Sequence, residues 1–317
     1  MDFKKSNFYA RGGTEIQFDK LYQYVDNELL NHFQITTSIP EKIPLSKDKI
    51  NILWVQNSYD QPNLAPWFKN KENHKKYDFY VFVSNWCYEQ YRKYFDIDTK
   101  RCVVIKNAID HFPKIIKYKK GDPFKLIFQP TPWRGLNVFL GAMQKIKNPN
   151  ITADVFSSTE IYGSHFNENN YEEFKPLFDQ AKKLPNVNYI GYKPNGYIME
   201  NIHNYQCFAY PNIWEETSCI SAIEALGAGL STILTNYGAL YETGTDFSIY
   251  VPYQKDWRYL AELFAYSIEE TYKRLHREEV QNFLVGQQDY YKKFYSWEKR
   301  KHEWTDFLQG VHGSKNK

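Results

Sequence analysis

Two glutamates stand eight positions apart in the stretch IWEETSCISAIEALGAG, at Glu216 and Glu224. Thr217 or Ser218 can cap a helix, and eight residues turn a helix by roughly 800°, so both acids would lie on about the same face. The free N–H groups of the first helical turn attract phosphate, and one carboxylate can accept hydrogen bonds from two ribose hydroxyls. The pattern indicates a site for an elongated, phosphate-bearing ligand. The alternative is a solvated acid before a helix and an ordinary surface glutamate.

The elements that must position these residues are short apolar runs that alternate with amphipathic stretches. Such runs predict buried strands, and strands that alternate with helices predict parallel sheets covered by helices on both faces. Sheets of this kind bind ligands at the carboxyl ends of their strands. The expected strands are residues 49–57, 78–85, 102–107, 124–130, 151–158, 187–192, 207–211 and 230–236, and the expected helices are residues 15–30, 86–95, 136–147, 171–183, 218–228 and the chain after 289.

A segment without periodicity at residues 111–123 divides the chain into two halves. It contains HFPK, a Lys-rich run and GDP, which are typical of a linker. We expect a first domain at residues 1–113, a second at residues 114–289, and a final helix at about 290–317 that packs back on the first. The two domains would be alike in architecture and would face each other across a cleft.

Composition and charge narrow the class of protein. The chain has 317 residues, a net charge of +3 and a pI of about 8.4, which is too mild to indicate nucleic-acid binding. Its four cysteines form no CxxC pair, so neither a zinc site nor a disulfide framework is expected. The first residues carry no signal-peptide pattern, and no apolar run reaches about 18 residues. We expect a cytoplasmic protein, and peripheral contact with a membrane stays open.

The wider stretch YPNIWEETSCISAIEALGAGLSTILTNYGALYE resembles the donor-site signature of the retaining GT-B glycosyltransferases, specifically the family 4-like group (glycosyl transferases group 1). The shared features are a strand that ends in proline, two glutamates separated by seven residues, a Gly/Ala-rich segment, a strand and a Gly-x-x-x-Glu loop at Gly238–Glu242. The resemblance implies two Rossmann-like domains, here with a reduced N-terminal domain whose first strand is shortened. It also implies that Glu216 holds hydroxyls of the donor sugar and that Glu224 binds the ribose.

Two further stretches resemble donor-binding loops of this family. QPTPWRGLNVFLGAM resembles a strand, loop and helix in which a Lys or Arg before Gly binds the donor diphosphate, and that residue is Arg134 here. Many members carry a second basic residue five positions earlier, where this chain has Gln129. Neutralisation of the diphosphate would therefore rest more on Arg134 and on backbone amides. NVNYIGYKP resembles the loop that meets the nucleobase, around Tyr192 and Lys193.

Weaker resemblances occur in the N-terminal half. ARGGTE resembles the Gly-rich loop that closes over the diphosphate, in which Gly12 and Gly13 let the backbone approach closely. ILWVQN resembles a strand that often ends in histidine, where this chain has Gln56, and VVIKNAID resembles the interdomain NGID segment. Ser84 follows a predicted strand and starts a predicted helix, so it would either contact the acceptor or simply cap that helix. The candidate acceptor or interdomain residues are Gln56, Asn57, Ser84 and Asn107.

The resemblance implies a retaining hexosyltransferase-type enzyme (EC 2.4) that uses a UDP-sugar or GDP-sugar and a glycan, lipid-linked or protein-linked acceptor. Catalysis would rest on Glu216, on the charge of Arg134 and on backbone amides, with no cofactor and no metal. Residues 96–98, DID, are interpreted as a polar loop instead of a metal motif. The alternatives are a catalytically degenerate GT-B scaffold subunit, and a phosphorylase or epimerase of the same architecture. The expected donor-binding residues are Gly12, Gly13, Arg134, Tyr192, Lys193, Thr217, Ser218, Cys219 and Glu224.

Overall fold

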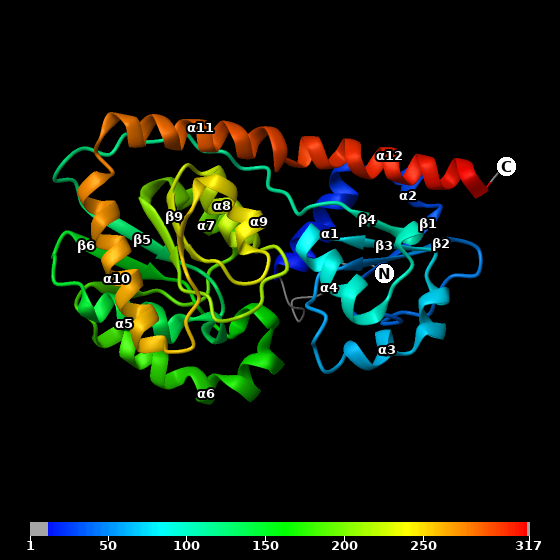
Figure 1. The fold of residues 1–317 in the computed structure, drawn as a ribbon, viewed down its shortest axis with the longest axis horizontal. Coiled ribbons are helices and arrows are strands. Elements are labelled where there is room, and N and C mark those ends of the chain that lie inside the picture. The colour runs from blue at the N-terminus through cyan, green and yellow to red at the C-terminus, as the bar shows by residue number, and fades with distance from the viewer. Residues whose placement is uncertain (1–11, 316–317) are drawn as a thin grey trace. The chain divides into compact units, whose positions relative to one another are not determined.

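The computed structural model describes residues 12–315, apart from the side chains of 162, 164–166, 314 and 315 (Figure 1). The chain forms two compact units. Of the described residues, the N-terminal unit comprises 13–110, 215–220 and 293–315, and the C-terminal unit comprises Gly12, 111–214 and 221–292. The shortened first strand expected before the Gly-rich loop lies outside the described residues.

The N-terminal unit is built on a four-stranded parallel sheet in the order β1-β2-β3-β4. Its strands are β1 (Phe33–Thr37), β2 (Ile50–Val55), β3 (Phe79–Phe82) and β4 (Cys102–Val104). All six residues of β2 are buried, as expected for a parallel strand covered on both faces. The helices are α1 (Gly13–Tyr24), α2 (Asn27–Leu30), α3 (Ala65–Lys69), α4 (Asn85–Phe95) and α12 (Trp297–Lys315). Trp304 of α12 packs edge-on against Trp54 of β2, so the last helix completes this core.

The C-terminal unit is built on a six-stranded parallel sheet in the order β10-β9-β8-β5-β6-β7. Its strands are β5 (Phe124–Phe128), β6 (Ile151–Val155), β7 (Val187–Tyr189), β8 (Cys207–Tyr210), β9 (Ser231–Thr235) and β10 (Ile249–Val251). Its helices are α5 (Leu136–Lys145), α6 (Ser164–Lys183), α7 (Asn195–Asn201), α8 (Ile220–Gly227), α9 (Leu240–Gly244), α10 (Trp257–Arg274) and α11 (Glu278–Phe294). The strand order reverses between β5 and β8, which is where doubly wound sheets bind ligands.

The predicted parallel sheets and their alternation with helices are confirmed, with differences at particular elements. The helix expected at 15–30 is two helices, because Asp26 lies between them and caps α2 by accepting a hydrogen bond from the Glu28 N–H at 3.0 Å. The helix expected after 289 is broken between α11 and α12. There Ile109 donates to Tyr295 O and accepts from the Trp297 N–H, each at 2.9 Å. The sequence analysis did not predict β1, β10 or α10.

None of the helices in the described residues is long and apolar enough to span a membrane.

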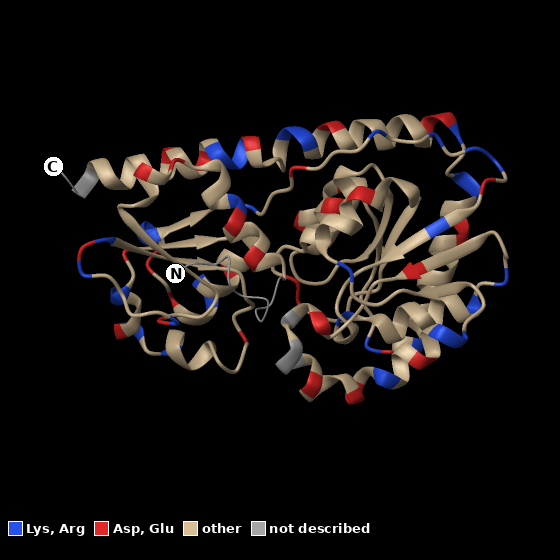
Figure 2. Cartoon of the chain, turned by 180° about the vertical axis from the view of Figure 1, so that it is seen from behind, with Lys and Arg blue, Asp and Glu red and all other residues tan. Residues whose placement is uncertain are grey.

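Charged residues are concentrated on helices and loops, and within the described strands they form one pair (Figure 2). Lys125 Nζ of β5 lies 2.7 Å from Asp154 Oδ2 of β6. Asp154 is 4% exposed, and it also accepts hydrogen bonds from the Tyr205 hydroxyl at 2.7 Å and from Asn188 Nδ2 at 3.1 Å. These donors offset the cost of burying a carboxylate. Burial, together with the bond to Asp154, raises the pKa of Tyr205.

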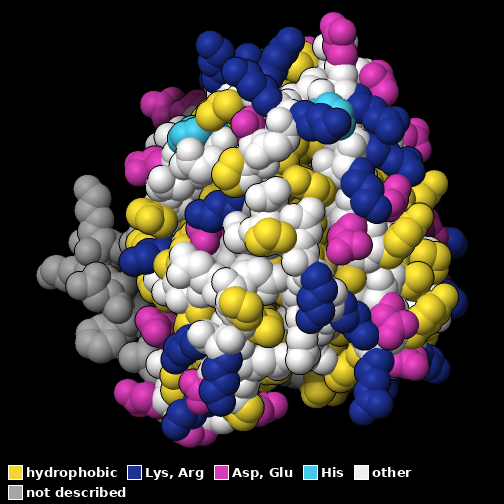
Figure 3. All heavy atoms as spheres, turned by 90° about the vertical axis from the view of Figure 1, so that its left-hand side faces the viewer, with side chains coloured by type: hydrophobic (Ala, Val, Ile, Leu, Met, Phe, Trp, Pro, Cys, Tyr) yellow, Lys and Arg dark blue, Asp and Glu magenta, His cyan; other side chains and the backbone are white. Residues whose placement is uncertain are grey.

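The outer face of the C-terminal unit, where α10 lies, mixes side chains of both signs (Figure 3). Helix α10 packs against α5, and Lys145 Nζ of α5 lies 3.0 Å from Glu262 Oε1 of α10. Because both side chains are largely exposed, the pair contributes little to stability. Its residues are therefore suitable controls for charged residues elsewhere in this unit.

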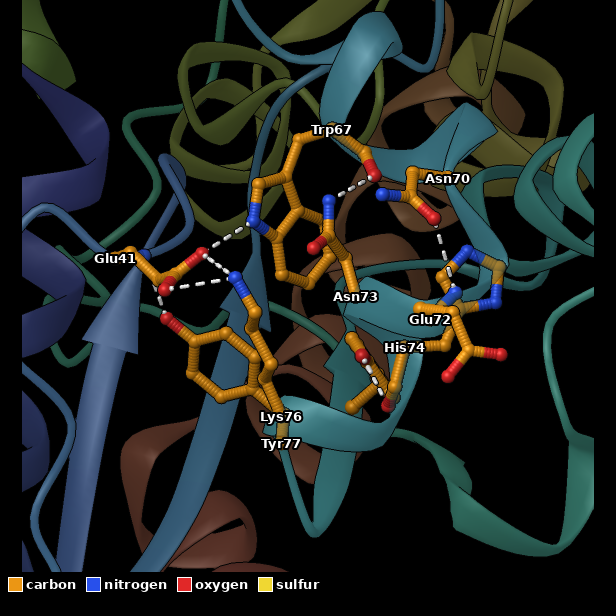
Figure 4. Close-up of polar contacts among 9 residues, drawn as sticks. Glu41, Trp67, Asn70, Glu72, Asn73, His74, Lys76 and Tyr77 are labelled. Carbon is orange, nitrogen blue, oxygen red and sulfur yellow. Dashed lines mark hydrogen bonds and ion pairs between the residues drawn. The ribbon is translucent and has the colours of Figure 1, made fainter.

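A polar cluster in the N-terminal unit surrounds Glu41 (Figure 4). Its carboxylate accepts hydrogen bonds from Trp67 Nε1 at 2.7 Å and from Lys76 Nζ at 2.9 Å. Its backbone, which is left-handed (φ 54°), donates from N–H to the Tyr77 hydroxyl at 2.8 Å. These contacts tie the β1–β2 loop to α3 and to the 3₁₀ turn Lys71–Lys76. The hydrogen bonds from Lys76 and Trp67 lower the pKa of Glu41.

We expect Glu41→Gln to lower the urea midpoint at pH 7, and the difference from wild type to shrink as the pH falls below about 4. A lowered folded-state pKa adds stability that is present above the unfolded-state pKa and lost as the pH falls through the folded-state value. The effect should be roughly 0.5–1 kcal/mol, because Glu41 is partly exposed. The control is Glu72→Gln, which breaks the exposed Glu72–Lys75 pair and should change less. A difference independent of pH would contradict this assignment.

Candidate functional site

Glu224 lies on α8, at the carboxyl edge of the C-terminal sheet, and is 5% exposed. Gln129, directly after β5, donates from Nε2 to Glu224 Oε2 at 3.2 Å. Asn195, the first residue of α7, donates from Nδ2 to Glu224 Oε1 at 2.7 Å. The interpretation of Glu224 as an ordinary surface glutamate is therefore wrong, since the carboxylate is buried and held by neutral amides from two elements. Asn195 was not predicted, because no charge or spacing in the sequence marks it.

Arg134 ends the 3₁₀ turn that follows β5. The next residue, Gly135, has φ 118°, and a Cβ there would lie 2.2 Å from the carbonyl oxygen of Pro211, directly after β8. Only glycine fits this close approach, so the loops after β5 and β8 meet where the strand order reverses. The Arg134 guanidinium lies over the ring of Trp214, with 5.9 Å from Cζ to the ring centroid. Trp214 was not predicted, although an aromatic residue two positions before Glu216 is a signal that could have found it.

Glu216 and Glu224 do not share a helix face, so that prediction is wrong. Helix α8 begins at Ile220, and Cys219 just before it has a left-handed backbone (φ 67°). Glu216 is 4% exposed and lies in residues 215–220, which belong to the N-terminal unit, whereas Glu224 belongs to the C-terminal unit. Glu216 is therefore not a solvated acid either. The amides of Thr217, Ser218 and Cys219 precede the helix instead of forming its first turn.

Thr217 is held by the edge of the N-terminal sheet, which explains why it does not cap α8. Its hydroxyl donates to the Gln56 carbonyl oxygen at 2.7 Å, and its own carbonyl oxygen accepts a hydrogen bond from Ser84 Oγ at 2.6 Å. A threonine hydroxyl engaged in this way is not available for the helix start. Ser84 also caps α4 by accepting from the Cys87 N–H at 2.9 Å. The explanation of Ser84 as a helix cap is confirmed, and its contact with Thr217 is additional.

Gln56 and Asn107 form a buried amide pair after β2 and β4. Asn107 Nδ2 donates to Gln56 Oε1 at 3.3 Å, and the residues are 3% and 8% exposed, respectively. The side-chain amide of Gln17, on α1, forms two hydrogen bonds with the backbone of Ala108. Its Nε2 donates to Ala108 O at 2.7 Å, and its Oε1 accepts from the Ala108 N–H at 3.0 Å. Gln17 was not predicted, since a glutamine within an amphipathic helix carries no signal of a distant backbone partner.

Gly13 and Asn57 each make a close backbone contact within the N-terminal unit. Gly12 is buried, and a Cβ on Gly13 would lie 2.6 Å from Ile220 Cδ1, so α1 begins in tight contact with the start of α8. The carbonyl oxygen of Asn57 accepts a hydrogen bond from the Tyr91 hydroxyl at 3.0 Å. The structure thus gives Asn57 a backbone contact.

The loop after β7 carries Tyr192 and Lys193. Tyr192 is partly buried, and Lys193 is exposed with Nζ 5.6 Å from the centroid of the Tyr197 ring. The loop leads directly into α7 and Asn195, so it is joined to Glu224 by the amide contact. Among the described residues, no three His, Cys, Asp or Glu side chains gather as a metal site would require.

These elements define a protein of the GT-B class, with two Rossmann-like α/β units. The fold is similar to a glycosyltransferase from Rickettsia africae (TM-score 0.69, 16% identity, 96% of this chain and 84% of that chain). It is also similar to sucrose-phosphate synthase from Thermosynechococcus elongatus (0.66, 12%, 89% and 74%) and to HepE of Anabaena in complex with UDP and glucose (0.60, 14%, 83% and 72%). No curated protein matches the chain.

The family model described as glycosyl transferases group 1 matches residues 110–283, which is more than half of the chain. The chain belongs to this family, and its general activity is glycosyl transfer. The matched segment contains the buried Glu224, Arg134 and the loop of Tyr192.

Proposed function

We propose that the protein is a retaining glycosyltransferase that moves a sugar from a nucleotide-diphosphate sugar to an acceptor hydroxyl. The observation that carries the proposal is the buried Glu224 carboxylate at the carboxyl edge of the C-terminal sheet, held by Gln129 and Asn195. A carboxylate oriented in this way is suited to accept hydrogen bonds from two ribose hydroxyls. The likeness to HepE, whose structures hold UDP and UDP-glucose, supports UDP as the first nucleotide to test.

Arg134 is the residue proposed to stabilise the leaving group. In such a transfer the bond between the anomeric carbon and the diphosphate oxygen breaks, and negative charge grows on the diphosphate. A cation fixed near this position lowers the barrier, because it interacts more strongly with the transition state than with the substrate. Trp214 supports this role, since the guanidinium over its ring has fewer accessible orientations. The amides of Gly12 and Gly13 would add donors, and the charge would be stabilised without a metal ion.

The other donor contacts are proposed from the family resemblance together with burial. Glu216, which is 4% exposed, would hold hydroxyls of the donor sugar. Tyr192 and Lys193 would meet the nucleobase, since their loop leads into the Asn195–Glu224 contact. Retention at the anomeric carbon is proposed from the resemblance alone.

The acceptor is proposed to be a hydroxyl of a glycan or of a lipid-linked or protein-linked sugar. The polar carboxyl edge of the N-terminal sheet supports this class, because Gln56 and Asn107 place amide groups there. Groups of this kind recognise hydroxyls by hydrogen bonding and do not require a charged acceptor.

The proposal is tested by incubating the chain with UDP-glucose, UDP-galactose, UDP-N-acetylglucosamine and GDP-mannose, and by measuring the nucleotide released with and without acceptor sugars. We expect acceptor-dependent release from one donor, reduced in Glu224→Gln and insensitive to a chelator. Loss of release in the chelator would overturn metal independence alone. Nucleotide binding without release from any donor would favour the scaffold alternative, and neither binding nor release would overturn the proposed function.

A further inference from the structure

A short hydrogen bond joins Glu224 to the loop after β7. Asn195 begins α7, directly after that loop, and its Nδ2 lies 2.7 Å from Glu224 Oε1. The loop and α7 connect β7 to β8, whereas α8, which carries Glu224, lies in the connection from β8 to β9. Asn195 therefore links two successive crossover connections at the carboxyl edge of the sheet.

The contact from Asn195 to this carboxylate is shorter than the contact from Gln129. Gln129 Nε2 lies 3.2 Å from Oε2 and also 3.4 Å from the carbonyl oxygen of Ser221, so its donor is shared. The two amides reach different oxygens, which fixes the plane of a group whose terminal torsion is otherwise broad. Because hydrogen bonds to ionised groups are strongest at short distance, Asn195 contributes more to this orientation than Gln129 does.

We propose that Asn195 is a positioning residue that orients the Glu224 carboxylate toward a vicinal diol, and that joins ribose recognition to the loop expected to hold the base. This inference rests on the proposed function. A vicinal diol engages both carboxylate oxygens in one plane, so a carboxylate that rotates loses part of the bidentate geometry. A neutral amide fixes the plane without bringing a cation that would compete with the hydroxyl donors.

The substitution Asn195→Asp tests this role through its pH dependence. Two carboxyl groups at hydrogen-bond distance do not both ionise readily, so the pair titrates with a raised pKa. Below that pKa the shared proton holds Glu224 as the amide does, and above it the two charges repel and Glu224 turns away. An aspartate at the first position of a helix is favourable, so the variant is expected to fold.

The measurement is the Kd of UDP at pH 5.5 and pH 8 by calorimetry, given as the ratio of variant to wild type at each pH. This ratio cancels the titration of UDP itself. For Asn195→Asp we expect a ratio of about 1–3 at low pH that rises to about 10 or more at high pH. For Asn195→Ala, which removes the donor without adding charge, we expect a ratio of about 10 at both values.

The matched control is Asn201→Asp on the same helix, where Nδ2 donates to the Tyr197 carbonyl oxygen at 2.8 Å. Its ratio should stay near 1 at both pH values. Ratios near 1 for both Asn195 variants, or an equal loss for Asn195→Asp at the two pH values, would overturn the positioning role. If wild type binds none of UDP, GDP and ADP, the proposed function fails instead. If wild type binds GDP or ADP instead of UDP, the same Kd ratios are measured with that nucleotide.

Discussion

Replacing Arg134 by alanine should lower the rate of sugar transfer by about 10²–10³-fold, the loss typical of removing one preorganised donor to a developing negative charge. The loop after β5 presents this residue, and Gly135 allows that loop to contact the carbonyl of Pro211 after β8. The charge on the diphosphate grows as its bond to the sugar breaks. The affinity for nucleotide should therefore fall less than the rate does.

The Arg134 prediction is measured as the initial rate of nucleotide release at saturating donor and acceptor. Arg134→Lys should give an intermediate rate, because an ammonium keeps the charge and loses the planar fork of donors. Lys145→Ala is the control, since it removes a cation from the outer face of the same unit, and its rate should equal that of wild type. A rate for Arg134→Ala above roughly a tenth of the wild-type rate would contradict the proposed role.

Arg300→Leu should lower the free energy of unfolding of the N-terminal unit by roughly 2–4 kcal/mol. Arg300 is 3% exposed and donates to the carbonyl oxygens of Lys106 at 2.5 Å and Phe294 at 2.7 Å, and to Glu303 Oε2 at 2.7 Å. Burial lowers the pKa of Arg300, but an arginine still remains charged at neutral pH. Removal of the guanidinium leaves two carbonyls without this donor, one at the end of α11 and one just before Asn107.

Urea unfolding followed by tryptophan fluorescence is suited to this test, because five of the eight tryptophans belong to the N-terminal unit. Arg300→Lys should fall between wild type and the leucine variant, since one ammonium cannot reach all three acceptors. Arg92→Leu removes an arginine from the exposed pair with Glu89 and should leave the midpoint unchanged. Equal midpoints for Arg300→Leu and Arg92→Leu would show that the buried contacts do not stabilise the unit.

The sheets could be predicted from the sequence because buried parallel strands are continuous apolar runs. The runs around Ile52 and Leu126 gave β2 and β5, and Ser84 was recognisable as a helix cap. The C-terminal end of α8 could also be predicted from its glycines. Gly229 has φ 75°, and the hydrogen bonds of Gly229 to Leu226 and of Leu230 to Ala225 form a Schellman motif.

The start of α8 could not be predicted, because long-range contacts decide it. Thr217 has the local properties of a cap, but its hydroxyl bonds to the carbonyl of Gln56, which lies 161 positions earlier. The amides around the site were missed for the same reason. Asn195 and Gln17 have neither charge nor a motif, and only the fold brings them to Glu224 and Ala108. The similarity to the family pointed to the Glu224 carboxylate, and the structure shows the amides that donate hydrogen bonds to it.

Calorimetric titration of wild type, Glu224→Ala and Glu224→Gln with UDP, GDP and ADP tests the account most directly. We predict micromolar binding of one nucleotide, weakened by roughly 1.5–3 kcal/mol in both variants, because each loses a carboxylate that accepts hydrogen bonds from hydroxyls. Glu262→Ala, on the exposed outer face, should bind as wild type does, and thermal unfolding should confirm that all variants fold. Binding of none of the three nucleotides, or equal binding by wild type and both Glu224 variants, would contradict a nucleotide-sugar site at Glu224.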